Sequence, residues 1–182
     1  GLKCVGIFAK RFWVCESPAK SLLVIDGEAV SQKLHAERLW RRFEANEPNS
    51  AASLFSRSVQ LRAHEAQAVV AMAPYFFRLG IEVSDFGGGA ISVSGMAFEL
   101  PENRLVQLLG EVQNDLALAE EERSAALISR LAETLASIDL MPDTNDAVLR
   151  QLAEVDLCHP KRPALGRKLV VLEVPFLRLE RS

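Results

Sequence analysis

A glycine-rich turn between two alternating segments is the feature that most constrains the fold of this chain. Residues 81–85 and 90–94 alternate apolar with polar side chains, as the paired strands of a β-hairpin do. The intervening Phe86-Gly87-Gly88-Gly89 supplies the positive φ angles that a tight loop requires. A phosphate-binding cradle would need GxGxxG spacing and a following helix, and both are missing, so we interpret the glycines as a turn.

The spacing of apolar residues predicts the helices and strands of the rest of the chain. The pattern predicts strands over 5–16, 21–26, 56–63 and 168–176, and helices over 28–43, 64–79, 101–118, 120–138 and 143–157. Residues 44–53, which include Pro48, are expected to be a linker. This order predicts an α+β fold of two subdomains. Residues 1–50 and 119–182 would form one subdomain from both chain ends, and 51–118 an inserted αβ subdomain with the hairpin.

The charge of the chain argues against a dedicated nucleic-acid binder. The formal net charge is −3 and the pI is near 5.7, whereas non-specific DNA affinity comes from clustered Lys and Arg. Two local basic clusters are either solvated faces or an auxiliary, weak DNA-contact surface. They are Arg38, Arg41 and Arg42, and then Lys161, Arg162, Arg167 and Lys168.

Cysteine usage and hydropathy bear on the cellular compartment. Cys4, Cys15 and Cys158 form no CxxC pair and leave an odd number, so we expect no disulfide framework and a reducing cytoplasm. The apolar runs are shorter than the roughly 20 residues of a membrane span, so no membrane association is expected. Because the first residue is Gly1 rather than Met, we expect a fragment of a longer protein.

Two short segments carry residue types that are typical of metal chemistry. Asp26-Gly27-Glu28-Ala29-Val30-Ser31-Gln32-Lys33 opens the first long helix, and Cys158-His159-Pro160-Lys161-Arg162-Pro163 follows the last helix. Carboxylates, imidazole and thiolate brought together can hold a divalent metal that activates water. Favourable ligands here reduce to Cys158 and Glu28, which are too few for a stable site. The sequence therefore predicts no bound metal and no cofactor.

The order and content of these elements resemble the C-terminal domain of the DNA mismatch repair protein MutL over nearly the whole chain. The middle block is particularly similar, with a helix ending in Phe77-Arg78-Leu79-Gly80-Ile81-Glu82-Val83 and a helix starting at Pro101-Glu102-Asn103-Arg104-Leu105. The resemblance implies a homodimerisation module in which 1–50 and 119–182 form the dimerisation subdomain. It also implies that a separate N-terminal ATPase domain lies outside this chain.

Many members of that family carry an endonuclease site, with an Asp-Gln-His-Ala-x-x-Glu-Arg pattern and a Cys-Pro-His-Gly-Arg-Pro turn. In this chain the histidine position of the first pattern is Glu28 and the glutamate position is Gln32. Pro160 takes the histidine position of the second pattern, and a shift of one residue places His159 on the opposite face of an extended segment. The degenerate motif positions are Asp26, Glu28, Gln32, Cys158 and Arg162. The resemblance thus implies a form that is not an enzyme; the alternative is a metal-dependent DNA-nicking endonuclease with a divergent site.

The resemblance also implies partners. The chain would bind a second copy of itself and join two ATPase arms into a DNA-encircling clamp. Further implied partners are the mismatch-recognition protein MutS, a separate strand-incising endonuclease and a helicase. Phe12, Trp13 and Leu172 are candidate anchors of the dimer interface or, alternatively, fill the monomer core. Ser53-Leu54-Phe55 occupies the place of a sliding-clamp-binding sequence but lacks its Gln and Pro.

Overall fold

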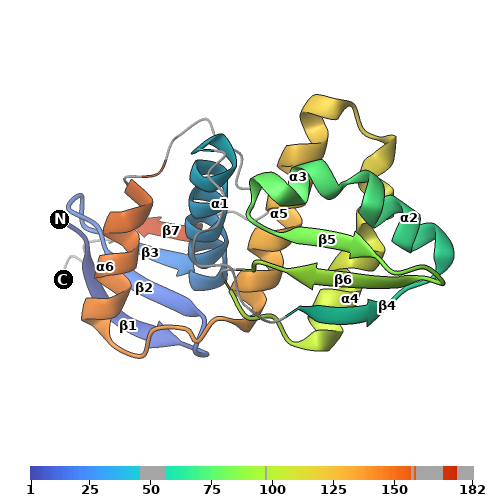
Figure 1. The fold of residues 1–182 in the computed structure, drawn as a ribbon. Helices are drawn as coiled ribbons and strands as arrows, with labels where there is room; N and C mark the ends of the chain where they lie inside the picture. Colours follow the sequence, from blue (N-terminus) through green and yellow to red (C-terminus); the bar gives the residue numbers. More distant parts are fainter. Residues whose placement is uncertain (46–55, 97, 157, 159–169, 176–182) are drawn as a thin grey trace, which may run out of the picture. The chain divides into compact units, whose positions relative to one another are not determined.

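The computed structural model describes residues 1–45, 56–96, 98–156, 158 and 170–175 of the protein. Helices and antiparallel strands both occur, so the fold is α+β as predicted (Figure 1). In chain order the elements are β1 (Lys3–Phe8), β2 (Phe12–Glu16), β3 (Ser21–Asp26), α1 (Gly27–Ala45), β4 (Arg57–Gln60), α2 (Ala63–Ala71), α3 (Ala73–Arg78), β5 (Glu82–Asp85), β6 (Ala90–Ser94), α4 (Glu102–Glu111), the 3-10 helix η1 (Val112–Ala117), α5 (Glu120–Ile138), α6 (Asn145–Asp156) and β7 (Val170–Pro175).

The strands form two antiparallel sheets. The first has the order β1-β2-β3-β7, so a strand from near the C-terminus pairs with one from near the N-terminus. The second has the order β4-β6-β5 and contains the glycine-rich hairpin. Gly87, Gly88 and Gly89 have φ angles of 83°, 62° and 85°, which confirms the turn. Strands adjacent in sequence pair within each sheet, and one strand in each pairs over a longer separation: β7 with β3 in the first sheet and β4 with β6 in the second.

The first sequence segment departs from its prediction. Residues 5–16 were expected to form one strand, and they form most of β1 and all of β2, joined by a tight turn. Ala9 and Lys10 occupy this turn with φ angles of 51° and 54°, and the Arg11 N–H donates to the Phe8 carbonyl at 3.1 Å. Non-glycine residues rarely adopt these angles, so the sequence carries no turn signal here.

The helices follow the predicted periods with two interruptions. The helix expected over 64–79 is divided into α2 and α3 at Met72, because Pro74 has no N–H for the next helical hydrogen bond. The helix expected over 101–118 ends at Glu111 and continues as η1. The helix expected over 120–138 is confirmed as α5 with the same bounds.

The chain divides into two compact units. The first unit comprises residues 1–35 and 136–182, and the second comprises 36–135. These boundaries fall inside α1 and α5, whereas the sequence placed them at 50/51 and 118/119. Contacts of the two helices explain the difference: the Phe43 ring of α1 lies under the Arg78 guanidinium of α3, and Arg130 of α5 bonds Asp115 of η1.

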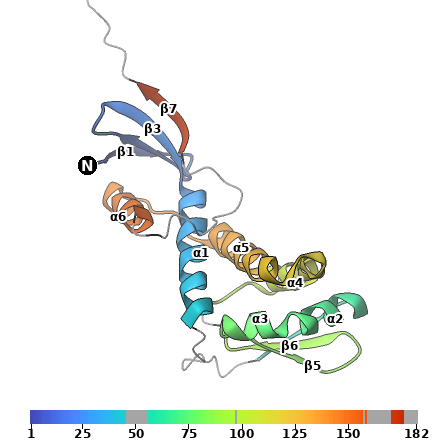
Figure 2. The same cartoon turned by 90° about the horizontal axis from the view of Figure 1, so that it is seen from above.

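In the first unit, the core lies between one face of the sheet and two helices. Inward side chains of the strands pack with Val30 and Leu34 of α1 and with Val148 of α6; they are Cys4, Trp13, Cys15 and Ile25. Figure 2 shows α6 and the start of α1 on the same side of this sheet. We call this side the inner face and the opposite side the outer face.

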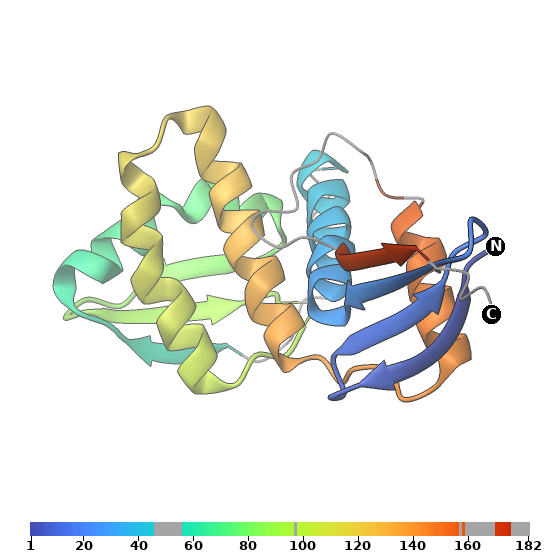
Figure 3. The same ribbon diagram turned by 180° about the vertical axis from the view of Figure 1, so that it is seen from behind.

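In the second unit, helices cover one face of the β4-β6-β5 sheet. α2, α3 and α4 lie on the same side of it, and Val59, Ile91 and Val93 are buried beneath them (Figures 2 and 3). The residues that point to the opposite face of this sheet are Ser58, Ser84, Ser92, Ser94, Gln60 and Glu82. The other face of this sheet is therefore polar, as expected where a sheet meets water.

Candidate functional site

The corner between β3 and α1 brings together the first group of motif residues. Asp26 is the last residue of β3, and Gly27 begins α1 with its N–H donating to the Arg11 carbonyl at 3.0 Å. A Cβ atom at position 27 would lie 2.7 Å from that carbonyl oxygen and 2.7 Å from Trp13 Cε2. Only glycine allows the helix to start this close to β2.

Arg11 occupies the centre of this corner. Its guanidinium binds Asp26 through two contacts, Nε to Oδ1 at 3.0 Å and Nη2 to Oδ2 at 2.6 Å. The third nitrogen, Nη1, lies 3.1 Å from Glu28 Oε2. One guanidinium therefore bridges the two carboxylates of the motif. We call Arg11, Asp26 and Glu28 the arginine-closed corner.

The electrostatics of the corner favour a closed ion pair. Burial raises the pKa of the Asp26 carboxyl, but hydrogen bonds and charge from Arg11, together with the N–H groups of Glu28 and Ala29, outweigh burial and hold its pKa below the ordinary value. The hydrogen bond to Asp26 likewise raises the pKa of Arg11. The Glu28 N–H donates to Asp26 Oδ1 at 3.1 Å, so the same carboxylate also caps α1.

The motif positions that the structure describes do not form a metal site. Gln32 is buried in α1, and Cys158 Sγ lies 3.5 Å from the Glu154 carbonyl oxygen while packing against the core of the first unit. Arg162, Lys161, Arg167 and the Ser53–Phe55 segment lie outside the described residues. Within the described part of the chain, no group of three or more His, Cys, Asp and Glu side chains could hold a metal ion.

A second polar cluster resembles a hydrolytic triad in composition only. Ser31 Oγ donates to Asp139 Oδ2, and His35 Nε2 lies 2.8 Å from the same oxygen. In a Ser-His-Asp triad the imidazole lies between the hydroxyl and the carboxylate and takes the hydroxyl proton. Here the carboxylate lies between the other two, so the arrangement ties α1 to the end of α5 and provides no activated nucleophile.

The outer face of the first sheet is apolar. Directly paired side chains cover it, with Phe8 opposite Phe12, Val24 opposite both Val14 and Leu172, and Leu22 opposite Val174. The exposed fractions are 67% for Phe8, 52% for Leu172 and 41% for Val174. Contiguous exposed apolar side chains of this kind mark association surfaces.

The three candidate anchors from the sequence separate between the two faces. Phe12 is half-buried and Leu172 is exposed, and both lie on the outer face. Trp13 is adjacent to Phe12 on the same strand and therefore points to the inner face, where none of its surface is exposed. It takes the core-filling role that the sequence left as the alternative, and its side chain is not available to a partner.

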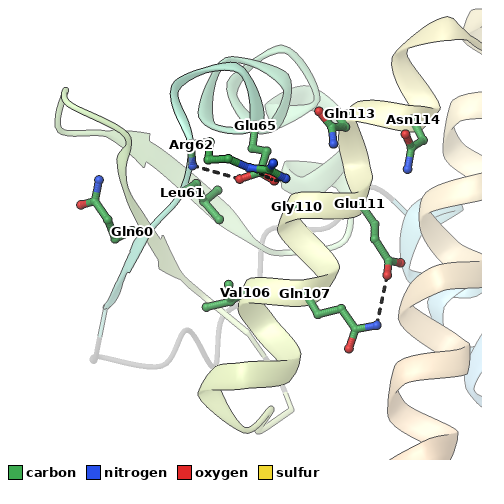
Figure 4. Close-up of a pocket in the computed structure, with 10 residues that line it drawn as sticks. All are labelled: Gln60, Leu61, Arg62, Glu65, Val106, Gln107, Gly110, Glu111, Gln113 and Asn114. Carbon is green, nitrogen blue, oxygen red and sulfur yellow. Dashed lines mark hydrogen bonds and ion pairs between the residues drawn. The ribbon is translucent and has the colours of Figure 1, made fainter.

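A pocket of about 570 Å³ lies in the second unit, between the start of α2 and α4 (Figure 4). Most of its polar lining is already paired. Arg62 bonds Glu65, the Gln107 amide donates to Glu111 at 3.1 Å, and the Gln60 amide donates to the Gly88 carbonyl at 2.8 Å. Arg62 and Glu65 neutralise each other, so we assign the pocket no catalytic role.

Two features of the site were not predicted from the sequence, the role of Arg11 and the apolar outer face. Arg11 gives no local signal, because Asp26 is distant in sequence and the two meet only through the pairing of Phe12 with Asp26. The outer face could have been predicted, because Leu22 and Val24, like Leu172 and Val174, are apolar residues two positions apart on one strand and so share a face. Of the basic cluster on α1, the exposed Arg41 bonds the buried Glu37, one helical turn before it, at 2.9 Å.

An exposed apolar sheet face is typical of a protein-association surface. A family model described as the MutL C terminal dimerisation domain matches residues 5–139, and the chain belongs to this family. It is 30% identical over 194 residues to the DNA mismatch repair protein MutL of Anaeromyxobacter sp. (strain K), covering 100% of this chain and 31% of that protein.

Other relatives agree. The chain is 29% identical over 190 residues to MutL of Myxococcus xanthus (strain DK1622), covering 99% of this chain and 30% of that protein. The match to MutL of Gemmatimonas aurantiaca is 28% over 160 residues, covering 84% of this chain and 26% of that protein. The chain thus spans about a third of the length of these curated relatives. Among its described residues, no helix is both long and apolar enough to cross a membrane.

Proposed function

We propose that this domain joins two copies of a DNA mismatch repair protein through the outer face of the β1-β2-β3-β7 sheet. The observation that carries the proposal is the run of paired apolar side chains on that face, including the exposed Phe8 and Leu172. Burying one such side chain contributes about 1.5–3 kcal/mol to association. A second copy offers the same face, which suits the self-complementary interface of a two-fold dimer.

The other sheet of the same chain provides an internal comparison. Its uncovered face carries the exposed Ser58 and Ser84 and needs no partner. A sheet face that remains in water is expected to look like this one, whereas the outer face of the first sheet does not. The contrast supports assigning dimerisation to the unit that carries the first sheet, residues 1–35 and 136–182, rather than to the wider ranges 1–50 and 119–182.

The arginine-closed corner supports a form without its own nuclease. A divalent ion at Asp26 and Glu28 would have to displace a guanidinium that already makes three short contacts with the two carboxylates. Glu28 and Gln32 also replace the histidine and glutamate of the family's pattern. In this proposal Asp26, Glu28, Gln32, Cys158 and Arg162 are remnants of a nuclease motif, and strand incision falls to a separate endonuclease.

The role of the whole protein follows from tethering. Two ATPase arms held together at one end have a raised effective concentration for each other, so their closure around DNA becomes an intramolecular step. In this proposal the arms are supplied by protein outside these 182 residues, which cover 31% of the MutL of Anaeromyxobacter sp. (strain K). The mismatch sensor MutS, the incising endonuclease and a helicase would then be recruited in the cytoplasm to the DNA-encircling clamp.

The dimer interface is tested with a charge placed on the outer face. Leu172→Glu changes a side chain that is 52% exposed in the single chain, so the monomer should fold normally. Burying an unpaired carboxylate costs several kcal/mol, so the dimer dissociation constant should rise at least about 100-fold. Ser58→Glu on the polar face of the second sheet is the matched control and should dimerise as the wild type does. Equal dimerisation of both variants would place the interface elsewhere.

The nuclease assignment is tested with supercoiled plasmid and Mn²⁺. The wild-type domain should leave the plasmid intact, and so should Cys158→Ala. Nicking by the wild type that disappears in Cys158→Ala would establish the alternative, a metal-dependent endonuclease with a divergent site.

A further inference from the structure

Two of the three cysteines face each other across neighbouring strands. Cys4 of β1 is the direct antiparallel partner of Cys15 of β2. Both side chains point to the inner face, where Cys4 is 6% exposed and Cys15 is fully buried. Neither the proposed dimer interface nor the arginine-closed corner uses these thiols.

The backbone geometry of the pair suits a disulfide. Directly opposite residues in an antiparallel pair have Cα atoms about 4.5–5.5 Å apart. A disulfide accepts Cα separations of about 4.4–6.8 Å, which includes this range. The register shifts directly after this pair, between Cys4 and Gly6. Burial first, and then the charge and hydrogen bonding of the Cys4 thiol, raise the pKa of Cys15 to about 12, which agrees with two neighbouring sulfur atoms.

We propose that Cys4 and Cys15 are an oxidation-sensitive dithiol that hydrogen peroxide converts to an intrachain disulfide. Peroxide oxygen adds to the Cys4 sulfur, giving a sulfenic acid and one water as the O–O bond breaks. The Cys15 sulfur then attacks the Cys4 sulfur, the S–S bond forms, the S–O bond breaks, and a second water leaves. The two thiols lose two electrons and two protons, and peroxide accepts both.

The position of β1 sets the rate of this reaction. Buried thiols with raised pKa values react slowly, because the thiolate is the reactive species. β1 is the outer strand of the sheet order β1-β2-β3-β7 and pairs with β2 alone among the described strands. Local opening of this strand exposes Cys4 without unfolding the sheet. The rate of oxidation therefore scales with the fraction of molecules in which the strand is open, and half-buried Cys158 reacts before the pair does.

Closing the disulfide changes a contact with α6. In the reduced state Cys4 Sγ donates to Asn145 Oδ1 at 3.3 Å, and Asn145 Nδ2 donates to the Cys4 carbonyl at 3.3 Å. A disulfide sulfur has no proton to donate, so oxidation removes the first of these two hydrogen bonds. The disulfide cross-links β1 to β2. Because Asn145 is the first residue of α6, the loss of its hydrogen bond destabilises the start of that helix.

The test is peroxide oxidation of the 182-residue domain followed by alkylation under denaturing conditions and mass spectrometry. The wild type and Cys158→Ser should both lose about 2 Da through the pair and yield a linked Cys4–Cys15 peptide that dithiothreitol separates. Cys15→Ala should yield no such peptide. Because Cys15→Ala alters the core and could unfold the protein, the inference is judged from the results for the wild type and Cys158→Ser. If Cys4 and Cys15 are both alkylated after Cys158 is fully oxidised, or if the linked peptide contains Cys158, the inference is overturned.

A second readout tests the coupling to α6. Hydrogen exchange of the amides in 145–148 should be faster in oxidised Cys158→Ser than in the reduced protein, while amides of β1 and β2 become slower. Unchanged exchange at 145–148 with a formed disulfide would overturn the coupling.

Discussion

Replacing Arg11 by Met removes the positive charge from the arginine-closed corner and keeps an aliphatic side chain above the Phe12 ring. The guanidinium carbon lies 5.2 Å from the centre of that ring, so Met preserves most of this packing. What is lost is the bidentate contact with Asp26 and the contact with Glu28. Lys10→Met, a change at an exposed neighbouring position, is the matched control.

The magnitude follows from the burial of the partners. Removing one member of a fully buried ion pair costs about 3–5 kcal/mol, because the other charge is left without compensation. The Asp26 side chain is only 8% exposed, but that of Arg11 is 40% exposed, so water screens part of the pair. The Glu28 N–H also continues to donate to Asp26. We therefore expect Arg11→Met to lower the free energy of unfolding by about 2 kcal/mol at pH 7.

The pH dependence has a definite sign. The folded-state pKa of Asp26 lies below its unfolded value, so the pair stabilises the protein at pH values above about 4. This contribution is lost as the pH falls through the lowered pKa. Urea unfolding between pH 7 and pH 3 should show a difference between wild type and Arg11→Met that shrinks toward the acid end. A difference below about 0.5 kcal/mol at pH 7, or one that does not change with pH, would refute the reasoning.

Two further predictions concern close packing and a buried charge. Gly27→Ala should lower the free energy of unfolding by about 2–3 kcal/mol, because the new Cβ would lie 2.7 Å from Trp13 Cε2. The control is Gly6→Ala, whose Cβ would have no atom within 4 Å and should cause no clash. Urea unfolding compares the two variants. Arg130→Met should lower the free energy of unfolding by about 2–4 kcal/mol, because Asp115 is 2% exposed and would lose its bidentate partner. A melting temperature within about 2 °C of the wild type would contradict this prediction.

The sequence was sufficient for most of the elements but not for the turns made by unusual residues. The glycine hairpin and α5 are local patterns, so periodicity and turn chemistry predict them without tertiary information. The turn at Ala9 and Lys10 depends on the pairing of β1 with β2, which overrides the local preference of both residues. The interruption at Met72 could have been predicted from Pro74, whose ring ends a preceding helix.

The candidate site shows the same division. The replaced motif positions Glu28 and Gln32 are visible in the sequence alone. The bridging role of Arg11 is not, because it requires the β2-β3 register that sets Phe12 opposite Asp26. The two roles of Phe12 and Trp13 also needed the structure, since alternation says that they face opposite sides but not which side is the core.

The central claim is that this domain forms a constitutive dimer. The most direct measurement is its absolute mass by light scattering across about 0.5 to 50 μM, which brackets micromolar dissociation constants. A mass of twice 20.1 kDa throughout the series is the predicted result. A constant mass of 20.1 kDa would contradict it, leaving the apolar outer face without the role assigned to it.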